Sequence, residues 1–225
     1  MNKVLFIGFE DCQYSQLAYS FLGTCGFDTT CFWATRERKT LIPQEIVDWR
    51  GDYIFHLKSY CILPKKIINS AKYYAVNFHP SPPKYPGSGG INWGLYNNDD
   101  FTGVTVHFMN EKIDNGDIIE YYKVPIFKND NIETLIPRVH FKQLEAFYDI
   151  VTQITQNGPW YLRKNLSYEW GSTVGRIRHI DKLQEIDFTI SKKELEKIIR
   201  ATSIGSFGPT LTLHDYKFTI KKENK

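Results

Sequence analysis

The first half of the chain alternates short apolar runs with segments of helical spacing. Four apolar or β-branched runs have the length of buried strands: residues 3–8, 29–35, 53–57 and 73–78. Three segments between them have helical spacing or a proline near the start: residues 13–25, 43–49 and 64–70. We expect Leu17, Phe21 and Leu22 on the buried face of the first helix. The alternation predicts the α/β class, a Rossmann-like open, mostly parallel sheet with helices on both faces.

The stretch after a loop rich in proline and glycine is expected to complete this sheet. Its predicted elements are a short helix, two strands and a long amphipathic helix, at residues 90–97, 102–109, 117–125 and 132–154. The dipeptide Asn115-Gly116 lies between the two strands and is a strong turn signal.

The pattern changes after residues 158 and 159, a Gly-Pro pair. Residues 165–183 are irregular and have no clear period. A helix is predicted over residues 191–202, because Ser191 suits the N-cap and Glu194 follows three residues later in the capping-box pattern.

Two short apolar segments near the end of the chain, residues 210–213 and 217–220, flank a polar turn and predict a hairpin. We therefore expect two parts, a main domain over residues 1–160 and a small extension of helix and hairpin over residues 161–225.

In a parallel α/β sheet, ligands bind beyond the carboxyl ends of the strands, so polar residues at that edge are the first candidates for a site.

Composition excludes several classes of protein. The 225 residues are 42% hydrophobic and 24% charged with a net charge of +3, which is ordinary for a globular protein and too small to argue for nucleic-acid binding. Lys221 and Lys222 are too short a basic tail to form a binding arm. Four cysteines occur without metal-ligand spacing, and no apolar run approaches the length of a membrane span. We expect a cytoplasmic protein with reduced thiols and neither metal, nucleic-acid nor membrane partners.

Candidate chemistry is densest in residues 77–90, a loop-rich segment with four prolines and three glycines. Asn77 and His79 are two apart on a strand and can face one cleft together. A histidine can take a proton near neutral pH, and an amide can stabilise an oxyanion, so the pair suits acyl transfer to an amine. Asp114, before the Asn-Gly turn, is the candidate carboxylate partner of His79. A structural histidine and an ordinary turn remain the alternative interpretation of these residues.

Two segments, residues 77–87 and 103–119, resemble the signature of the folate-dependent formyltransferases, and the resemblance extends over about residues 1–129. This family includes glycinamide ribonucleotide transformylase, methionyl-tRNA formyltransferase and the nucleotide-sugar N-formyltransferases. The resemblance implies that Asn77, His79 and Asp114 are catalytic and that N10-formyltetrahydrofolate is the formyl donor, with no metal. It implies proton transfer at His79, oxyanion stabilisation by Asn77, and support of the histidine charge by Asp114.

The resemblance also implies where folate binds. One segment, after the third strand, resembles the loop whose backbone contacts the pterin, and a second resembles the loop that closes over it. The implied folate-binding residues are Ser59, Tyr60, Cys61, Ile62, Leu63, Asn110, Glu111, Lys112 and Ile113. We expect the Cys61 thiol to be packed and unreactive.

Three acceptor classes are open within the family. Glu10 and Asp11 in the loop after the first strand disfavour the phosphate of glycinamide ribonucleotide. The short extension and small net charge disfavour methionyl-tRNA. Residues 83–90 and 92–97 resemble the enzymes that act on nucleotide-linked amino sugars of surface polysaccharides such as O-antigen. The favoured acceptor is dTDP-4-amino-4,6-dideoxyglucose, and its 3-amino isomer remains open.

The residues expected to bind this sugar nucleotide are Ser81, Lys84, Tyr85, Gly87, Ser88, Gly89, Trp93, Arg176 and Arg178. Lys84, Arg176 and Arg178 are the candidate cations for the pyrophosphate, and Trp93, Tyr85 and Trp170 are candidate stacking partners for the base.

The extension is expected to support a homodimer, as it does in small members of the sugar group. Two other classes stay open: a hydrolase of formyl-folate, and a non-catalytic module that binds folate or nucleotide sugar. Consumption of folate without an amine would distinguish the hydrolase. His107, His140 and His214 are expected to be structural or surface residues.

Overall fold

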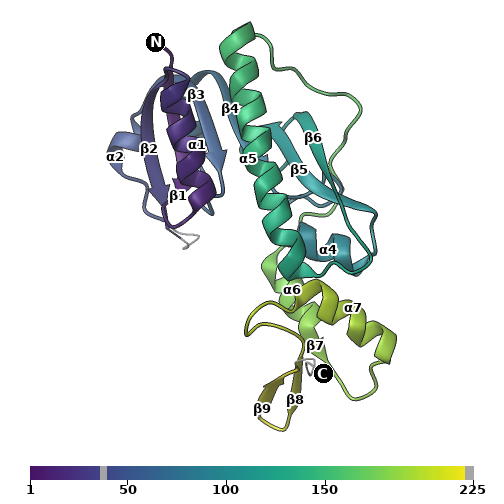
Figure 1. Ribbon diagram of the computed structural model, residues 1–225. Helices are drawn as coiled ribbons and strands as arrows, with labels where there is room; N and C mark the ends of the chain where they lie inside the picture. Colours follow the sequence, from purple (N-terminus) through teal and green to yellow (C-terminus); the bar gives the residue numbers. More distant parts are fainter. Residues whose placement is uncertain (36–39, 221–225) are drawn as a thin grey trace.

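Six strands form the central sheet of the computed structural model, which describes residues 1–35 and 40–220 (Figure 1). In chain order they are β1 (Lys3–Phe9), β2 (Asp28–Ala34), β3 (Gly51–Leu57), β4 (Ala71–His79), β5 (Phe101–Phe108) and β6 (Ile118–Pro125). Their order across the sheet is β2-β1-β3-β4-β5-β6. Strands β1 to β4 are parallel, whereas β5 is antiparallel to both of its neighbours. The predicted Rossmann-like, mostly parallel sheet is confirmed.

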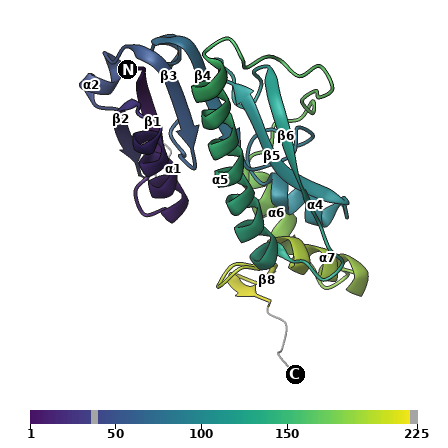
Figure 2. The same ribbon diagram turned by 45° about the horizontal axis from the view of Figure 1, so that its top comes forward.

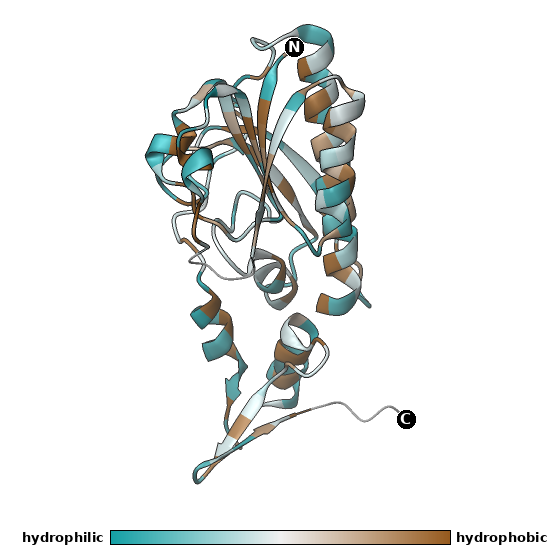
Figure 3. Ribbon diagram, turned by 90° about the vertical axis from the view of Figure 1, so that its left-hand side faces the viewer, coloured by the Kyte–Doolittle hydropathy of each residue, from teal (hydrophilic) through white to brown (hydrophobic). Residues whose placement is uncertain are grey.

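Helices cover both faces of this sheet, as predicted (Figure 2). They are α1 (Gln13–Thr24), α2 (Gln44–Val47), α3 (Lys65–Ile68) and α5 (Ile132–Asn157). Alternate residues of a strand point to opposite faces, so Val4 and Phe6 join the core under α1 and α5. Leu5 and Ile7 instead join a second core cluster with residues of α2 and α3. Hydrophobic positions accordingly follow the strands and the sheet-facing side of α5 (Figure 3).

The buried face of α1 differs from the one predicted. Leu17 is 42% exposed, and the buried residues of the helix are Ser15, Ala18 and Leu22, with Phe21 packed at the edge of the core. The Ser15 hydroxyl accepts a hydrogen bond from the backbone N–H of Phe9. The buried face of α1 therefore includes a polar residue, Ser15, and does not include Leu17, which its apolar spacing had predicted to be buried.

The C-terminal extension is more ordered than its sequence pattern indicates. Residues 165–183 were expected to be irregular, but α6 spans Ile177–Gln184 and leads into a short strand, β7 (Glu185–Ile186). The apolar surface of α6 is small, since Ile180 is its buried residue and packs beside Gly89 in the main domain. The helix therefore depends on a tertiary contact that periodicity does not reveal.

The predicted helix and hairpin of the extension are confirmed. Helix α7 (Lys192–Thr202) has Ser191 as its N-cap, whose hydroxyl accepts from the Glu194 amide. The second bond of a capping box is replaced, because the Glu194 carboxylate accepts from the Tyr96 hydroxyl on α4 (Gly90–Tyr96). Strands β8 (Thr210–Leu213) and β9 (Tyr216–Thr219) form the hairpin and join β7 in a three-stranded sheet.

Hydrogen bonds fasten α7 to the main domain. The Asn92 side chain donates to the Ala201 carbonyl, and Arg200 donates to the backbone carbonyls of Asp130 and Phe127. None of the helices in the described residues is long and apolar enough to cross a membrane. The basic pair at residues 221 and 222 lies outside the described residues.

Candidate active site

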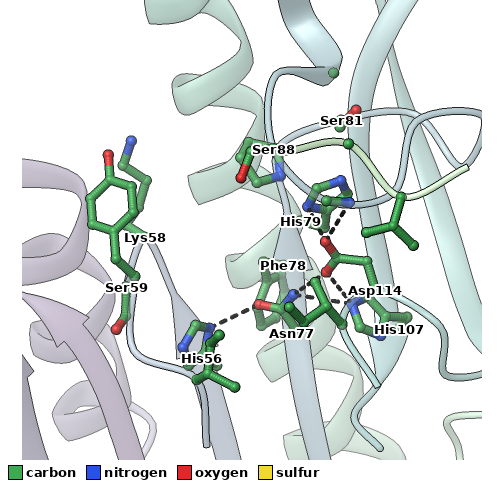
Figure 4. Close-up of a pocket in the computed structure, with 18 of the residues that line it drawn as sticks. His56, Lys58, Ser59, Asn77, Phe78, His79, Ser81, Ser88, His107 and Asp114 are labelled. Atoms are coloured by element: carbon green, nitrogen blue, oxygen red, sulfur yellow. Dashed lines mark hydrogen bonds and ion pairs between the residues drawn. The ribbon is translucent and has the colours of Figure 1, made fainter. Parts of the chain in front are cut away.

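The carboxyl end of β4 carries the two residues that sequence analysis placed first, Asn77 and His79 (Figure 4). Strand register sets their neighbours: Asn77 is paired with His56 on β3 and with His107 on β5. Asp114 enters the same region from the loop between β5 and β6. Three histidines, an amide and a carboxylate thus converge at the sheet edge where α/β proteins bind ligands.

The Asn77 side chain lies at the centre of this cluster. Its Nδ2 donates to Asp114 Oδ1 at 3.2 Å and to His107 Nε2 at 3.0 Å. His107 can accept there because its other ring nitrogen, Nδ1, donates to the Phe108 carbonyl at 2.8 Å. On the opposite side, Asn77 Oδ1 lies 2.9 Å from Nδ1 of His56. The amide orientation is therefore fixed from both neighbouring strands.

Asp114 is buried, with 9% of its side chain exposed, and its backbone has a left-handed φ of 42°. Oδ2 accepts from the Gly87 amide at 2.8 Å and lies 3.3 Å from His79 Nδ1, and Oδ1 lies 3.3 Å from His107 Nε2. Burial acts to raise the pKa of this carboxyl, but the His79 imidazole and the Gly87 amide outweigh it. They hold the Asp114 pKa well below its usual range, so the side chain is a carboxylate.

His79 has an oxygen acceptor beside each ring nitrogen. Nε2 lies 3.1 Å from the Tyr85 carbonyl, and Nδ1 faces the Asp114 carboxylate. Burial lowers the pKa of His79, and Asp114 opposes that effect. A neutral ring at rest can accept one proton, and the imidazolium that results would have both N–H groups matched by acceptors.

A cavity of about 940 Å³ opens over this cluster. All nine residues predicted to bind folate line it. Its apolar wall includes Cys61, Leu63, Ile68 and Met109, which belong to the core cluster on the α2 and α3 side of the sheet. The Cys61 thiol is buried, and burial raises its pKa, as expected for an unreactive cysteine.

The residues predicted to bind the sugar nucleotide divide into two groups. Those that line the cavity are Ser81, Gly87, Ser88, Gly89 and Arg176. The others, Lys84, Tyr85, Trp93 and Arg178, are not among its lining residues. Lys84 Nζ pairs with Asp99 at 2.7 Å, and the Tyr85 hydroxyl donates to the same carboxylate. These two side chains thereby hold the loop whose Tyr85 carbonyl contacts His79.

The C-terminal extension closes one side of the cavity. Gly175 donates to the Pro86 carbonyl at 2.7 Å and accepts from the Ser88 amide at 2.9 Å, so the two segments pair like strands. Trp170 donates to the Gly116 carbonyl, and its ring meets that of His107 at 5.0 Å, edge to face. Trp170 therefore covers the histidine cluster.

Sequence analysis assigned no role at the site to three histidines that line this cavity. His56 was not singled out, and His107 and His140 were expected to be structural or surface residues, yet all three line it. Strand alternation places His107 on the side of Thr105 and Gly103, without indicating a neighbouring carboxylate. His214 is exposed at the tip of the hairpin, as expected. Within residues 1–35 and 40–220, no group of three His, Cys, Asp or Glu side chains is arranged to hold a metal ion.

The fold and site define an α/β protein with an asparagine amide and a histidine–carboxylate pair at the sheet edge. The family described as formyl transferase matches residues 13–151, and the chain belongs to this folate-dependent family. A methionyl-tRNA formyltransferase of Prochlorococcus marinus (strain MIT 9312) is 32% identical over 133 residues, which are 57% of this chain and 39% of that protein. The chain thus spans less than half the length of this relative.

Solved structures share the fold over a greater length. A sugar N-formyltransferase from Shewanella sp FDAARGOS_354 superposes with a TM-score of 0.80 at 19% identity, covering 100% of this chain and 98% of that one. The formyltransferase PseJ from Anoxybacillus kamchatkensis, in complex with UDP-4,6-dideoxy-4-formamido-L-AltNAc and tetrahydrofolate, superposes with a TM-score of 0.64 at 20% identity. That match covers 80% of this chain and 88% of PseJ.

Proposed function

We propose that this protein transfers the formyl group of N10-formyltetrahydrofolate to the amine of a nucleotide-linked amino sugar. The observation that carries the proposal is the hydrogen-bonded set of Asn77, His79 and Asp114 in the wall of one large cavity. Formyl transfer to an amine needs a proton acceptor for the attacking nitrogen and a donor for the oxyanion, and this set contains both.

His79 acts as the proton acceptor. Its ring is neutral at rest because burial lowers the pKa, so it can take the proton that the attacking amine loses. The imidazolium then donates to the Tyr85 carbonyl and to the Asp114 carboxylate. Asp114 stays ionised throughout and balances the charge that His79 gains.

Asn77 acts as the oxyanion donor. Both of its amide hydrogens have acceptors in this structure, Asp114 Oδ1 and His107 Nε2. The longer contact, to Asp114, is the one that a developing oxyanion would replace. Since His56 and His107 hold the amide from either side, little reorientation is needed when charge forms.

The residues present fit folate as the bound formyl donor. Leu63, Ile68 and Met109 offer an apolar wall for a flat ring, and the segments 59–63 and 110–113 line the same cavity. Formyl-folate supplies the activated formyl carbon when bound, and the chain supplies binding, orientation and proton transfer.

Two observations favour an amino sugar as the acceptor. The Shewanella sugar N-formyltransferase shares the fold of this chain over nearly its whole length. The PseJ structure holds UDP-4,6-dideoxy-4-formamido-L-AltNAc, whose formamide is on sugar carbon four. We propose dTDP-4-amino-4,6-dideoxyglucose as the acceptor, with the 3-amino isomer next.

We also propose that the extension, over residues 161–225, forms a homodimer through its hairpin. β9 is an edge strand, and its aromatic residues Tyr216 and Phe218 are 72% and 52% exposed. An open edge with exposed aromatic side chains suits pairing with a second copy of the same strand.

A product assay tests the proposed chemistry. Purified protein, N10-formyltetrahydrofolate and a panel of acceptors would be combined, and products followed by mass spectrometry. The panel would hold the 4-amino and 3-amino dTDP sugars, glycinamide ribonucleotide and methionyl-tRNA. We expect a formylated 4-amino sugar, a rate about 10²- to 10⁴-fold lower in His79→Ala, and a loss of rate in acid with an apparent pKa below about 6.5.

Other outcomes of this assay are equally informative. Product from methionyl-tRNA or glycinamide ribonucleotide alone would overturn the sugar assignment while leaving formyl transfer intact. Steady folate consumption without an amine would identify a hydrolase. No turnover with any acceptor, combined with folate binding, would identify a binding module.

A further inference from the structure

A half-buried lysine faces the cavity away from the catalytic cluster. Lys58 directly follows β3, has a left-handed φ of 62°, and lines the cavity together with His140 of α5. Lys58 Nζ lies 2.8 Å from His140 Nε2 and donates to it. Among the described residues, no carboxylate forms an ion pair with Lys58. A cation in a cavity without an anionic partner lacks an ion pair that a bound anion can supply.

Other cations of the cavity are placed differently. Lys112 and Arg176 also line it, but both are exposed at its mouth. Lys84, the first candidate from the sequence, is neutralised by Asp99 outside the cavity lining. Lys58 is thus the lining cation that a second cavity residue, His140, holds in position. Because its position is fixed before an anion binds, Lys58 is the best candidate among these cations to bind one.

Lys58 and the apolar wall proposed for folate make contacts with different elements. That wall belongs to the core cluster of α2 and α3, whereas His140 lies on α5 and its ring meets Tyr14 of α1, 6.1 Å away. Lys58 comes two residues after His56, and His56 is paired with Asn77 on the neighbouring strand, about 4.8 Å away across the sheet. An acceptor with its amine at His79 can therefore extend toward Lys58 without entering the folate wall.

We infer that Lys58 and His140 form the subsite for the diphosphate of the acceptor, which rests on the proposed nucleotide-sugar function. The three hydrogens of Nζ allow Lys58 to keep its bond to His140 and still donate to a phosphate oxygen. His140 works as a neutral ring, since burial and the adjacent ammonium lower its pKa to about 3. The pair is therefore one fixed positive charge rather than two.

Binding of inert analogues tests the subsite without the chemistry. dTDP-glucose and UDP-glucose carry the diphosphate but no amine, and their affinities would be measured by calorimetry. We expect Lys58→Met to weaken both about 10- to 100-fold, and Lys58→Arg to retain most of the affinity. Lys142→Met is the matched control, because Lys142 lies on the same helix as His140, pairs with Glu145, and does not line the cavity.

The pH dependence gives a second, independent readout. Burial lowers the Lys58 pKa to about 8, the titratable groups beside Lys58 are His140 and Cys12, and Tyr14 packs against His140. Raising the pH through this value removes the positive charge, so dTDP-glucose affinity should fall between about pH 7 and about pH 9. In Lys58→Arg the affinity should stay level, because arginine remains charged.

Equal affinities of the wild-type protein and Lys58→Met would overturn the inference. So would a loss confined to tetrahydrofolate, because Lys58 would then hold the glutamate carboxylates of folate. The outcome is separable from the proposed chemistry. Binding that depends on Lys58, without formyl transfer, would contradict the proposed reaction and support the subsite. Formyl transfer with an unchanged KM for the sugar in Lys58→Met would support the reaction and contradict the subsite.

Discussion

Asp114 joins more of the site than any other single side chain described above. Its carboxylate meets Gly87, Asn77, His79 and His107, which come from three separate segments. Its left-handed backbone is costly for a residue with a side chain, and such strain persists where the surroundings fix it. The strained turn is what brings the carboxylate between the two imidazoles.

Replacing Asp114 should change how stability depends on pH. A carboxyl whose pKa is depressed by folding contributes stability above its unfolded pKa, and loses that contribution as the pH falls toward the folded value. Denaturant unfolding at neutral pH and at about pH 3 would measure this. We expect wild-type stability to fall more steeply than that of Asp114→Asn below about pH 4, and equal slopes would contradict the assigned ionisation.

His56 is predicted to position Asn77 rather than to touch the substrate. Its ring nitrogens face Asn77 Oδ1 and the Cys61 carbonyl, and a neutral ring can donate to one of them at a time. The tautomer of His56 thus couples the oxyanion donor to the segment proposed for folate.

We expect His56→Phe to lower kcat about tenfold and to raise the KM for formyl-folate, with partial recovery in His56→Gln. Steady-state kinetics would separate the two constants. His214→Asn, in the exposed hairpin turn, is the control. A fall in stability with both constants unchanged would reduce His56 to a packing residue.

The candidate residues were predictable from sequence only where a motif carried them. Asn77, His79 and Asp114 followed from two segments with familiar spacing. His56 and His107 stand in strands that alternate as ordinary core does, and their roles depend on the register of three strands. Lys58 was missed because its partner, His140, is 82 residues away on a helix.

At the scale of elements, hydrophobic periodicity predicted the strands and helices that bury a continuous apolar face. The strands and α5 have buried stripes that a sequence reveals, and they were found. α6 and β7 have almost none: α6 packs its Ile180 beside Gly89, and β7 pairs with β8. Short elements held by contacts distant in sequence are the part that a local pattern does not specify.

Gly175→Ala should loosen the join between extension and loop. An added Cβ would lie 2.3 Å from the Ser88 carbonyl oxygen, so the two segments would have to separate. Because Arg176 and Val174 reach the cavity through this join, we expect the KM for the sugar nucleotide to rise several-fold with kcat less affected. Kinetics with each substrate varied in turn would show it.

The control for this variant is Gly23→Ala on α1. No atom lies within 4 Å of a Cβ added there, and the position is helical, so the change should stabilise the protein by about 0.5–1 kcal/mol without altering either KM. If Gly175→Ala left sugar binding intact, the extension would be a neighbour of the site and not part of it.

At the scale of the molecule, the exposed hairpin predicts association. Tyr216 and Phe218 lie on one face of β9, since residues two apart on a strand share a side. We expect wild-type protein to elute as a dimer in light-scattering chromatography, and the double variant Tyr216→Glu, Phe218→Glu to elute as a monomer. Phe141→Glu, an exposed aromatic on α5, should leave the mass unchanged, and a monomeric wild type would refute the proposal.

The pairing of Gly175 with the 86–88 loop has a consequence for how such proteins diverge. The histidine proposed for proton transfer lies on the sheet, whereas part of the cavity wall comes from a segment that follows the sheet in the chain. Exchange of the gene's 3′ end between relatives could therefore replace the acceptor while leaving the reaction untouched. An enzyme arranged in this way can acquire new substrates by recombination, without first passing through an inactive ancestor.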